Sequence, residues 1–191
     1  MEQTAGSLTD LVPHPAAPPR CSTLRVAAAV ALDGRGLLLT FVLHAEPRAL
    51  VLAEPSPRPG RRDRLWEHTC CEAFVGTSEG SAYLELNLAP SGDWALWAFD
   101  GYRSGMRAAA TVAVPRLCVL RGAAEVRFDA LLDVAVPRGF LGPAPYRVGL
   151  TAVVEERDGG TSYFACRHAA ERPDFHARDG WTRTVYPSAD A

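Results

Sequence analysis

Hydrophobic and polar residues alternate strictly between Tyr83 and Leu88, where the chain reads Tyr-Leu-Glu-Leu-Asn-Leu. A period of two is typical of a β-strand with one face against a hydrophobic core. The pattern predicts that the three leucines point into that core. It places Tyr83, Glu85 and Asn87 on the opposite face, directed outward.

The segment just before it has the same period. Cys71, Ala73 and Val75 form its apolar set, and Glu72 and Phe74 lie on the other side. If the two strands pair, one sheet face carries three polar side chains beside two aromatic rings. Such a face suits a hydroxyl-rich ligand such as a sugar, because polar groups bond to hydroxyls and rings cover C–H surfaces. The alternative is the ordinary solvated outer face of a sandwich sheet.

The remaining chain is a series of short β-like runs separated by turn residues. The expected strands are 23–31, 36–44, 49–53, 65–76, 81–89, 94–99, 109–120, 124–134, 146–156 and 161–168. Residues 136–141 are expected to form one helical turn, and no long amphipathic helix is present. About nine or ten such strands predict an all-β fold, an antiparallel β-sandwich or jelly roll. We expect residues 1–22, which contain four prolines, to form an extended or disordered arm, and residues 23–191 to form one domain.

Composition narrows the class of protein. The chain has 191 residues, 48% of them hydrophobic and 22% charged, and a formal net charge of -2. This charge gives no broad attraction to nucleic acid or an anionic membrane, and no apolar run is long enough to span a bilayer. The N-terminus lacks the pattern of a signal peptide, and five cysteines, an odd number, favour reduced thiols. We therefore expect a cytoplasmic protein without nucleic-acid or membrane partners.

Four blocks of sequence together carry a family resemblance. They are residues 65–74, 83–94, 99–106 and 167–176. With these blocks in this order, the chain resembles the bacterial DOMON-like proteins related to family 9 carbohydrate-binding modules. The resemblance covers residues 23 to 181, or most of the chain.

The resemblance implies a jelly-roll-like β-sandwich with a ligand site on its concave sheet face. In the carbohydrate-binding relatives two aromatic rings sandwich a sugar, while polar side chains and an arginine bind its hydroxyls. Other relatives in the wider superfamily bind haem through methionine and histidine. We therefore expect a non-catalytic module whose partner is a cytosolic saccharide, a sugar nucleotide or a cell-wall precursor.

Eight residues are candidates for ligand binding: Trp66, Glu72, Glu85, Asn87, Trp97, Tyr102, Arg103 and His168. Trp66 and Trp97 are the proposed stacking platforms, with core packing as the alternative for each. The two glutamates and Asn87 form the hydrogen-bonding set. Tyr102 and Arg103 lie in a glycine-flanked loop, where the guanidinium could contact a carboxylate, phosphate or vicinal diol; packing on a sheet edge is the alternative.

Other chemistry finds less support in the sequence. His168, Asp174, His176 and Asp179 have metal-binding side chains, but their spacing matches no metal motif, so we expect a hydrogen-bonded loop and no metal. Met106 with His168 or His176 could bracket a haem iron, yet no C-x-x-C-H motif is present and no cofactor is expected.

Catalysis and protein docking are the remaining alternatives. Glu72 and Glu85 could form the carboxylate pair of a glycosidase, but no catalytic motif accompanies them, and we expect no enzyme. A protein-interaction domain that docks a protein partner on its sheet face stays open as the second hypothesis.

Overall fold

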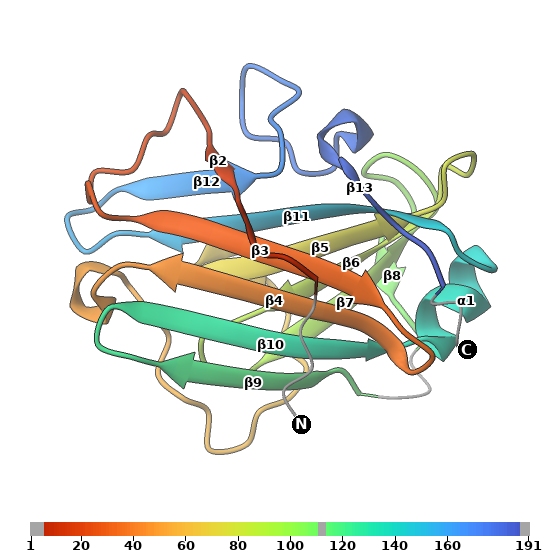
Figure 1. Ribbon diagram of the computed structural model, residues 1–191, viewed down its shortest axis with the longest axis horizontal. Helices are drawn as coiled ribbons and strands as arrows, with labels where there is room; N and C mark the ends of the chain where they lie inside the picture. The colour runs from red at the N-terminus through yellow and green to blue at the C-terminus, as the bar shows by residue number, and fades with distance from the viewer. Residues whose placement is uncertain (1–5, 111–113, 188–191) are drawn as a thin grey trace.

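Two antiparallel sheets stacked face to face make up the computed structural model, which describes residues 6–110 and 114–187 (Figure 1). The five-stranded sheet runs in the order β1 (Thr9–Asp10), β3 (Arg25–Leu32), β4 (Gly36–His44), β10 (Glu125–Asp133) and β9 (Arg116–Arg121). The eight-stranded sheet runs β2 (Val12–Pro13), β12 (Thr161–Ala165), β11 (Tyr146–Glu155), β5 (Cys70–Gly76), β6 (Tyr83–Leu88), β7 (Trp94–Phe99) and β8 (Arg107–Ala108). Its remaining strand, β13 (Arg183–Val185), pairs with the other end of β11. The predicted β-sandwich class is confirmed.

In the described part of the chain, four short helices connect or flank the strands: η1 (Pro47–Ala49), η2 (Leu65–Glu67), α1 (Ala135–Leu141) and η3 (Arg178–Gly180). Helix α1 confirms the helical turn expected at 136–141. Within the described residues no helix is long and apolar enough to cross a bilayer.

The sequence pattern was wrong at three of the expected strands. Residues 49–53 form no strand, and only Leu50 makes an isolated bridge, to Glu156. The expected strand 65–76 begins with the 3-10 helix η2, so Trp66 lies on a helical turn. The strand expected at 109–120 starts only at Arg116, and residues 111–113 lie outside the described residues. The unexpected strands β1, β2, β8 and β13 have two or three residues each, too few for a period to show.

The core lies between the sheets and follows the predicted alternation. Leu84, Leu86 and Leu88 of β6 are almost fully buried there, opposite Phe41 of β4 and its flanking leucines. Burying one such side chain contributes about 1.5–3 kcal/mol. The register of β5 and β6 pairs Glu72 with Asn87 and places the predicted polar set on the other face of the sheet.

The N-terminal segment is extended and joins both sheets. Strand β1 pairs with β3, and β2 pairs with β12. Leu11, between the two strands, is buried in the main core. The segment therefore crosses from one sheet to the other at the same side of the sandwich.

Candidate functional site

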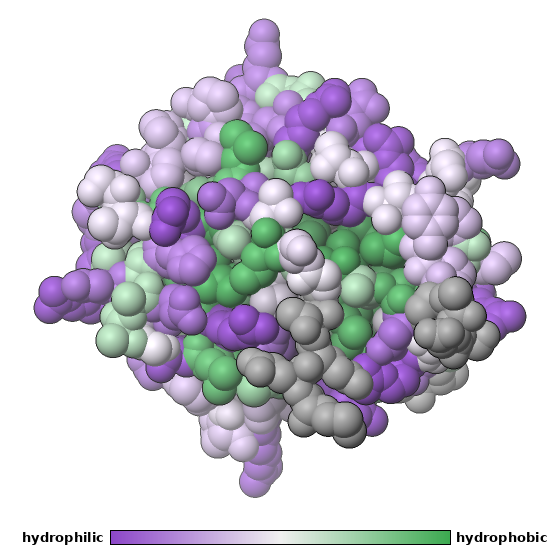
Figure 2. Space-filling model, viewed as in Figure 1, coloured by the Kyte–Doolittle hydropathy of each residue, from purple (hydrophilic) through white to green (hydrophobic). Residues whose placement is uncertain are grey.

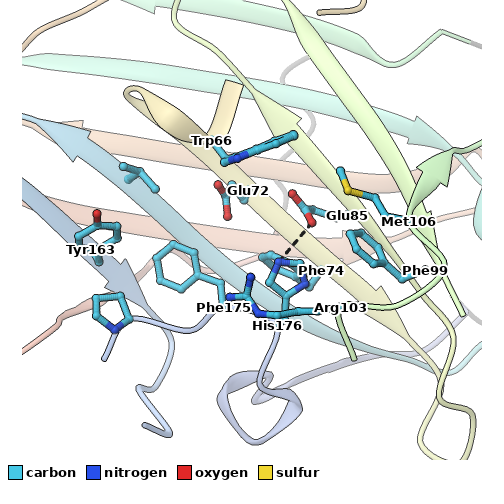
Figure 3. Close-up of a pocket in the computed structure, with 12 residues that line it drawn as sticks. Trp66, Glu72, Phe74, Glu85, Phe99, Arg103, Met106, Tyr163, Phe175 and His176 are labelled. Carbon is cyan, nitrogen blue, oxygen red and sulfur yellow. Dashed lines mark ion pairs between the residues drawn. The ribbon is translucent and has the colours of Figure 1, made fainter. Parts of the chain in front are cut away.

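A cavity of about 340 Å³ lies on the face of the eight-stranded sheet that points away from the core (Figure 3). Strands β5, β6 and β7 supply its floor through Glu72, Phe74, Glu85 and Phe99. Trp66 of helix η2 covers one side. Its other walls are the loop after β7, residues on β11 and β12, and the segment 166–181.

Segment 166–181 covers the part of the polar face around Tyr83 and Glu85. Tyr83 and Asn87 are fully buried, and Glu85 is 4% exposed. The alternation predicted the correct face, but the expectation that these side chains point into solvent was wrong. His176 and Trp181 of this segment pack on Tyr83 at ring-centroid distances of 5.8 and 5.2 Å.

The two floor glutamates are only partly satisfied by hydrogen bonds. Glu72 Oε2 accepts a bond from Thr151 Oγ1 at 3.3 Å, and Glu85 Oε1 accepts one from Asn87 Nδ2 at 2.8 Å. Glu85 Oε2 lies 3.7 Å from His176 Nε2, beyond hydrogen-bond distance. Within the described residues, Glu72 Oε1 and Glu85 Oε2 accept no hydrogen bond.

Burial in this cavity changes the acidity of both glutamates. It raises the pKa of Glu72 well above its usual range, and the negative charge of Glu85 raises it further. Burial also raises the pKa of Glu85, against the opposing effects of the Asn87 hydrogen bond and the Arg103 charge. The charged form of each carboxyl is costly because water is replaced by protein without a compensating cation in contact.

Arg103 is held at the cavity wall by an acidic partner. Its guanidinium donates to Asp174 Oδ1 at 2.9 Å, and the Tyr102 hydroxyl donates to Asp174 Oδ2 at 2.6 Å. Although burial opposes it, these two hydrogen bonds lower the pKa of Asp174. The charge of Arg103 is therefore largely neutralised by Asp174. The backbone of Arg103 is left-handed, with a φ of 50°.

His176 is neutral and fixed in one orientation. Burial, with the nearby Arg103 charge, lowers its pKa to about 4, and burial raises the pKa of Tyr83 to about 12. Tyr83 Oη lies 2.6 Å from His176 Nδ1 and accepts the backbone N–H of Arg103 at 3.2 Å. The tautomer that satisfies this network has the Tyr83 hydroxyl donating to Nδ1, which leaves the imidazole proton on Nε2, toward Glu85.

Trp181 anchors the covering segment to the sheet. Its indole is 1% exposed and stacks on Phe74 at 5.7 Å between ring centroids. Its Nε1 donates to the Phe175 carbonyl at 2.8 Å, and its own carbonyl accepts from Arg147 Nε at 2.7 Å. This anchor fixes the backbone just beside Phe175 and His176, two of the cavity walls.

Trp66 and Trp97 do not form two parallel walls. Their ring centroids are 5.9 Å apart and their planes are inclined by 73°, which leaves no space for a sugar between them. Trp66 lines the cavity, whereas the Trp97 ring lies beside it and is covered by the Arg61 guanidinium at 4.6 Å. Trp97 Nε1 is buried without a hydrogen-bond partner among the described residues.

The structure brings half of the eight predicted residues into the cavity wall, namely Trp66, Glu72, Glu85 and Arg103. Asn87 lies behind Glu85 and orients it, and Tyr102 binds Asp174 outside the cavity lining. His168 is placed elsewhere: its Nε2 lies 2.8 Å from the Val12 carbonyl, and its ring packs edge-on against His14.

Sequence reasoning did not select several lining residues, chiefly Phe99, Tyr163, Phe175 and His176. Phe99 lies two residues after Trp97 in β7, so a period of two places both side chains on the same sheet face and could have selected Phe99. Phe175 and His176 come from an irregular segment, where no period identifies the inward side chains.

Metal and haem ligation find no support in the geometry. Among the described residues, no group of three or more His, Cys, Asp and Glu side chains could hold a metal ion. Met106 and His176 both line the cavity, but the two imidazole nitrogens face Tyr83 and Glu85. His168 lies outside the cavity lining.

Comparison with known proteins identifies similar folds. No protein-family model and no curated protein matches the chain. A "putative carbohydrate-binding protein" from Bacteroides uniformis is similar in structure, with a TM-score of 0.71, 16% identity, and coverage of 95% of this chain and 86% of that one.

Two structures of a family 9 carbohydrate-binding module from Caldicellulosiruptor kristjanssonii also match, each at 8% identity. The glucose complex has a TM-score of 0.57 and covers 98% of this chain and 87% of that one. The cellotriose complex has a TM-score of 0.55 and covers 94% and 82%. At these identities the likeness shows a shared β-sandwich fold.

Proposed function

We propose that this protein is a non-catalytic saccharide-binding module whose ligand occupies the cavity above Glu72 and Glu85. One observation carries the proposal: two buried carboxylates with unused acceptor oxygens lie among aromatic rings in a cavity of about 340 Å³. This volume is within the usual range for small-molecule sites.

The side chains match the two kinds of surface that a sugar presents. Figure 3 shows the carboxylates in the space between Trp66 and the rings of Phe175 and His176. The rings cover C–H faces, and each free carboxylate oxygen accepts a hydrogen bond from a hydroxyl group. His176 Nε2 supplies a donor beside Glu85.

The structural neighbours support the same ligand class. The two Caldicellulosiruptor kristjanssonii structures contain glucose and cellotriose. On the basis of the four sequence blocks, we also propose that the protein belongs to the bacterial DOMON-like group. We further propose a cytoplasmic location. All five cysteines are free, which suits a reducing compartment.

The structural neighbours favour a binding module over a glycosidase. The two solved structures named as family 9 modules are carbohydrate-binding modules.

Protein docking, the second hypothesis, finds no comparable feature. Figure 2 shows apolar side chains on the five-stranded side of the sandwich interrupted by polar ones. The large apolar side chains that are exposed among the described residues are scattered over loops and strand ends, for example Leu8, Val51 and Tyr186.

Isothermal titration calorimetry against a panel of mono- and oligosaccharides tests the proposal. We expect Trp66→Ala and Phe175→Ala each to weaken binding by about tenfold or more, because each removes an aromatic wall. Tyr186→Ala is the matched control, since this ring is exposed and outside the cavity. Folded wild-type protein that binds no saccharide in the panel, or equal losses in the control, would overturn the proposal.

A further inference from the structure

Acidic side chains outnumber basic ones in the cavity. Glu72 and Glu85 lie on its floor, and Arg103 is the single cation among its described lining residues. That cation is already paired with Asp174 at 2.9 Å, outside the lining. His176 is neutral, since its pKa lies near 4. The site therefore has two carboxyl groups and no free positive charge to balance them.

The unused oxygens of these carboxyls face the cavity. Glu72 and Glu85 are 3% and 4% exposed, and within the described residues neither Glu72 Oε1 nor Glu85 Oε2 receives a hydrogen bond. Neither oxygen is among the buried polar atoms closed off from solvent. Both are thus open to a ligand, and a hydrogen bond in which the donor or the acceptor is ionised is about twice as strong as one between two neutral groups.

Aromatic faces around the carboxyls favour the same kind of group. Trp66, Phe74, Phe99, Tyr163 and Phe175 all line the cavity. The face of an aromatic ring attracts a cation within about 6 Å of its centre, and most strongly where water is excluded. Neutral hydroxyls would use the acceptor oxygens but would not replace the proton of the pair with a positive charge.

We propose that the saccharide bound here carries a free ammonium group, as in an amino sugar whose nitrogen is not acetylated, and that this ammonium donates to Glu72 and Glu85. This inference rests on the proposed function and names the ligand class of the same site. An N-acetyl group would place a neutral amide against the carboxyls and remove the charge match.

Binding of such a ligand releases a proton. In the free protein, burial raises the pKa of both glutamates and the charge of Glu85 raises that of Glu72 further, so these carboxyls hold a proton to a higher pH than free glutamates do. When an ammonium enters, the carboxyl O–H bond breaks, the proton leaves to buffer and the carboxylate accepts the ammonium N–H. The neighbouring groups Tyr83, His176 and Asp174 keep their protonation states, because their pKa values are shifted away from neutrality.

Calorimetry on the full chain with three matched tetrasaccharides tests this inference. The ligands are the β-1,4 oligomers of glucosamine, N-acetylglucosamine and glucose, each titrated in phosphate and in Tris, whose ionisation enthalpies differ. We expect the glucosamine oligomer to bind at least about tenfold more tightly than the other two, with proton release for that ligand alone. Equal or tighter binding of the neutral oligomers would overturn the ammonium inference and leave the saccharide function standing.

Ethanolamine, a small primary ammonium ion that can donate N–H bonds, distinguishes the two proposals. If ethanolamine binds and no saccharide does, the ammonium site stands and the saccharide function fails. If neither ethanolamine nor any saccharide binds, both fail.

Glu72→Gln and Glu85→Gln keep the side-chain shape and remove the charge. Each is expected to reduce the preference for the glucosamine oligomer to about twofold or less, whereas Glu79→Gln, on an exposed loop, leaves it unchanged. If a floor variant does not fold, the buffer dependence of the wild-type titration still decides the question.

Discussion

Replacing Gly149 by alanine should loosen the covering segment from the sheet. Gly149 lies on β11 directly beneath Trp181, and a Cβ there would be 2.4 Å from Cδ1 and 2.9 Å from Cγ of the indole. Carbon atoms in contact prefer about 3.5–4.0 Å, so the indole must move by about 1 Å or more. Gly76 borders the same ring from β5, which limits where the indole can go.

The expected cost follows from what Trp181 holds. Overpacking of a buried site costs about 1–3 kcal/mol, and weakening the hydrogen bond from Nε1 to the Phe175 carbonyl costs about 1 kcal/mol more. We expect Gly149→Ala to lower the free energy of unfolding by about 2–4 kcal/mol. Because the shift reaches Phe175 and His176, saccharide binding should weaken as well.

Urea denaturation, followed by tryptophan fluorescence, measures this change as a lower midpoint at an unchanged slope. Gly139→Ala is the control, because Gly139 lies in helix α1 with no atom within 4 Å of the added methyl group. That control should leave the protein unchanged or up to about 1 kcal/mol more stable. A Gly149→Ala protein within about 0.5 kcal/mol of wild type, with normal ligand binding, would refute the reasoning.

Three further outcomes follow from the polar network. Tyr83→Phe removes the hydrogen bond to His176 and the acceptor for the Arg103 backbone N–H. It should lower the free energy of unfolding by about 2 kcal/mol, measured by thermal or urea unfolding. An unchanged midpoint would contradict the hydrogen-bond network. Folding lowers the pKa of His176 from 6.5 to about 4. The neutral imidazole therefore adds to the free energy of unfolding above pH 6.5, and on the order of 3 kcal/mol of that free energy is lost as the pH falls to about 4. Unfolding curves of His176→Gln should lack this loss. Folding raises the pKa of Glu72, so the contribution of its protonated carboxyl to the free energy of unfolding is lost as pH rises above about 4.5. Glu72→Gln should therefore gain stability relative to wild type as the pH rises from about 5, and a difference that stays constant with pH would count against a buried charge.

The alternation along the chain was enough to predict the sandwich and one face of the site. It predicted that Glu72 and Asn87 share a sheet face and that the β6 leucines are buried, because a period of two assigns each side chain to a face; the register that pairs Glu72 with Asn87 comes from the structure. It could not assign Trp97 to a face, because the turn at residues 90–93 resets the register; the structure pairs Trp97 of β7 with Glu85 of β6.

The cover over that face could not be predicted from local pattern. Segment 166–181 has no period, and its contacts to Tyr83 join residues about 90 positions apart. The choice of His168 over His176 has the same cause, since both lie in irregular chain and only the packing against Phe74 separates them. The position of Trp66 depends on helix η2, a single turn too short for periodicity to reveal.

The N-terminal segment pairs with an edge strand of each sheet, and this pairing affects the solubility of the protein. Strand β1 occupies the free edge of β3, and β2 occupies that of β12. An unpaired edge strand is a template for pairing with another chain, through domain swapping or aggregation. A version lacking residues 6–14 would expose two such edges at once, next to a core that has lost Leu11. Shortened forms of this protein should therefore self-associate, and affinity tags at the N-terminus need a linker that leaves both short strands free to pair.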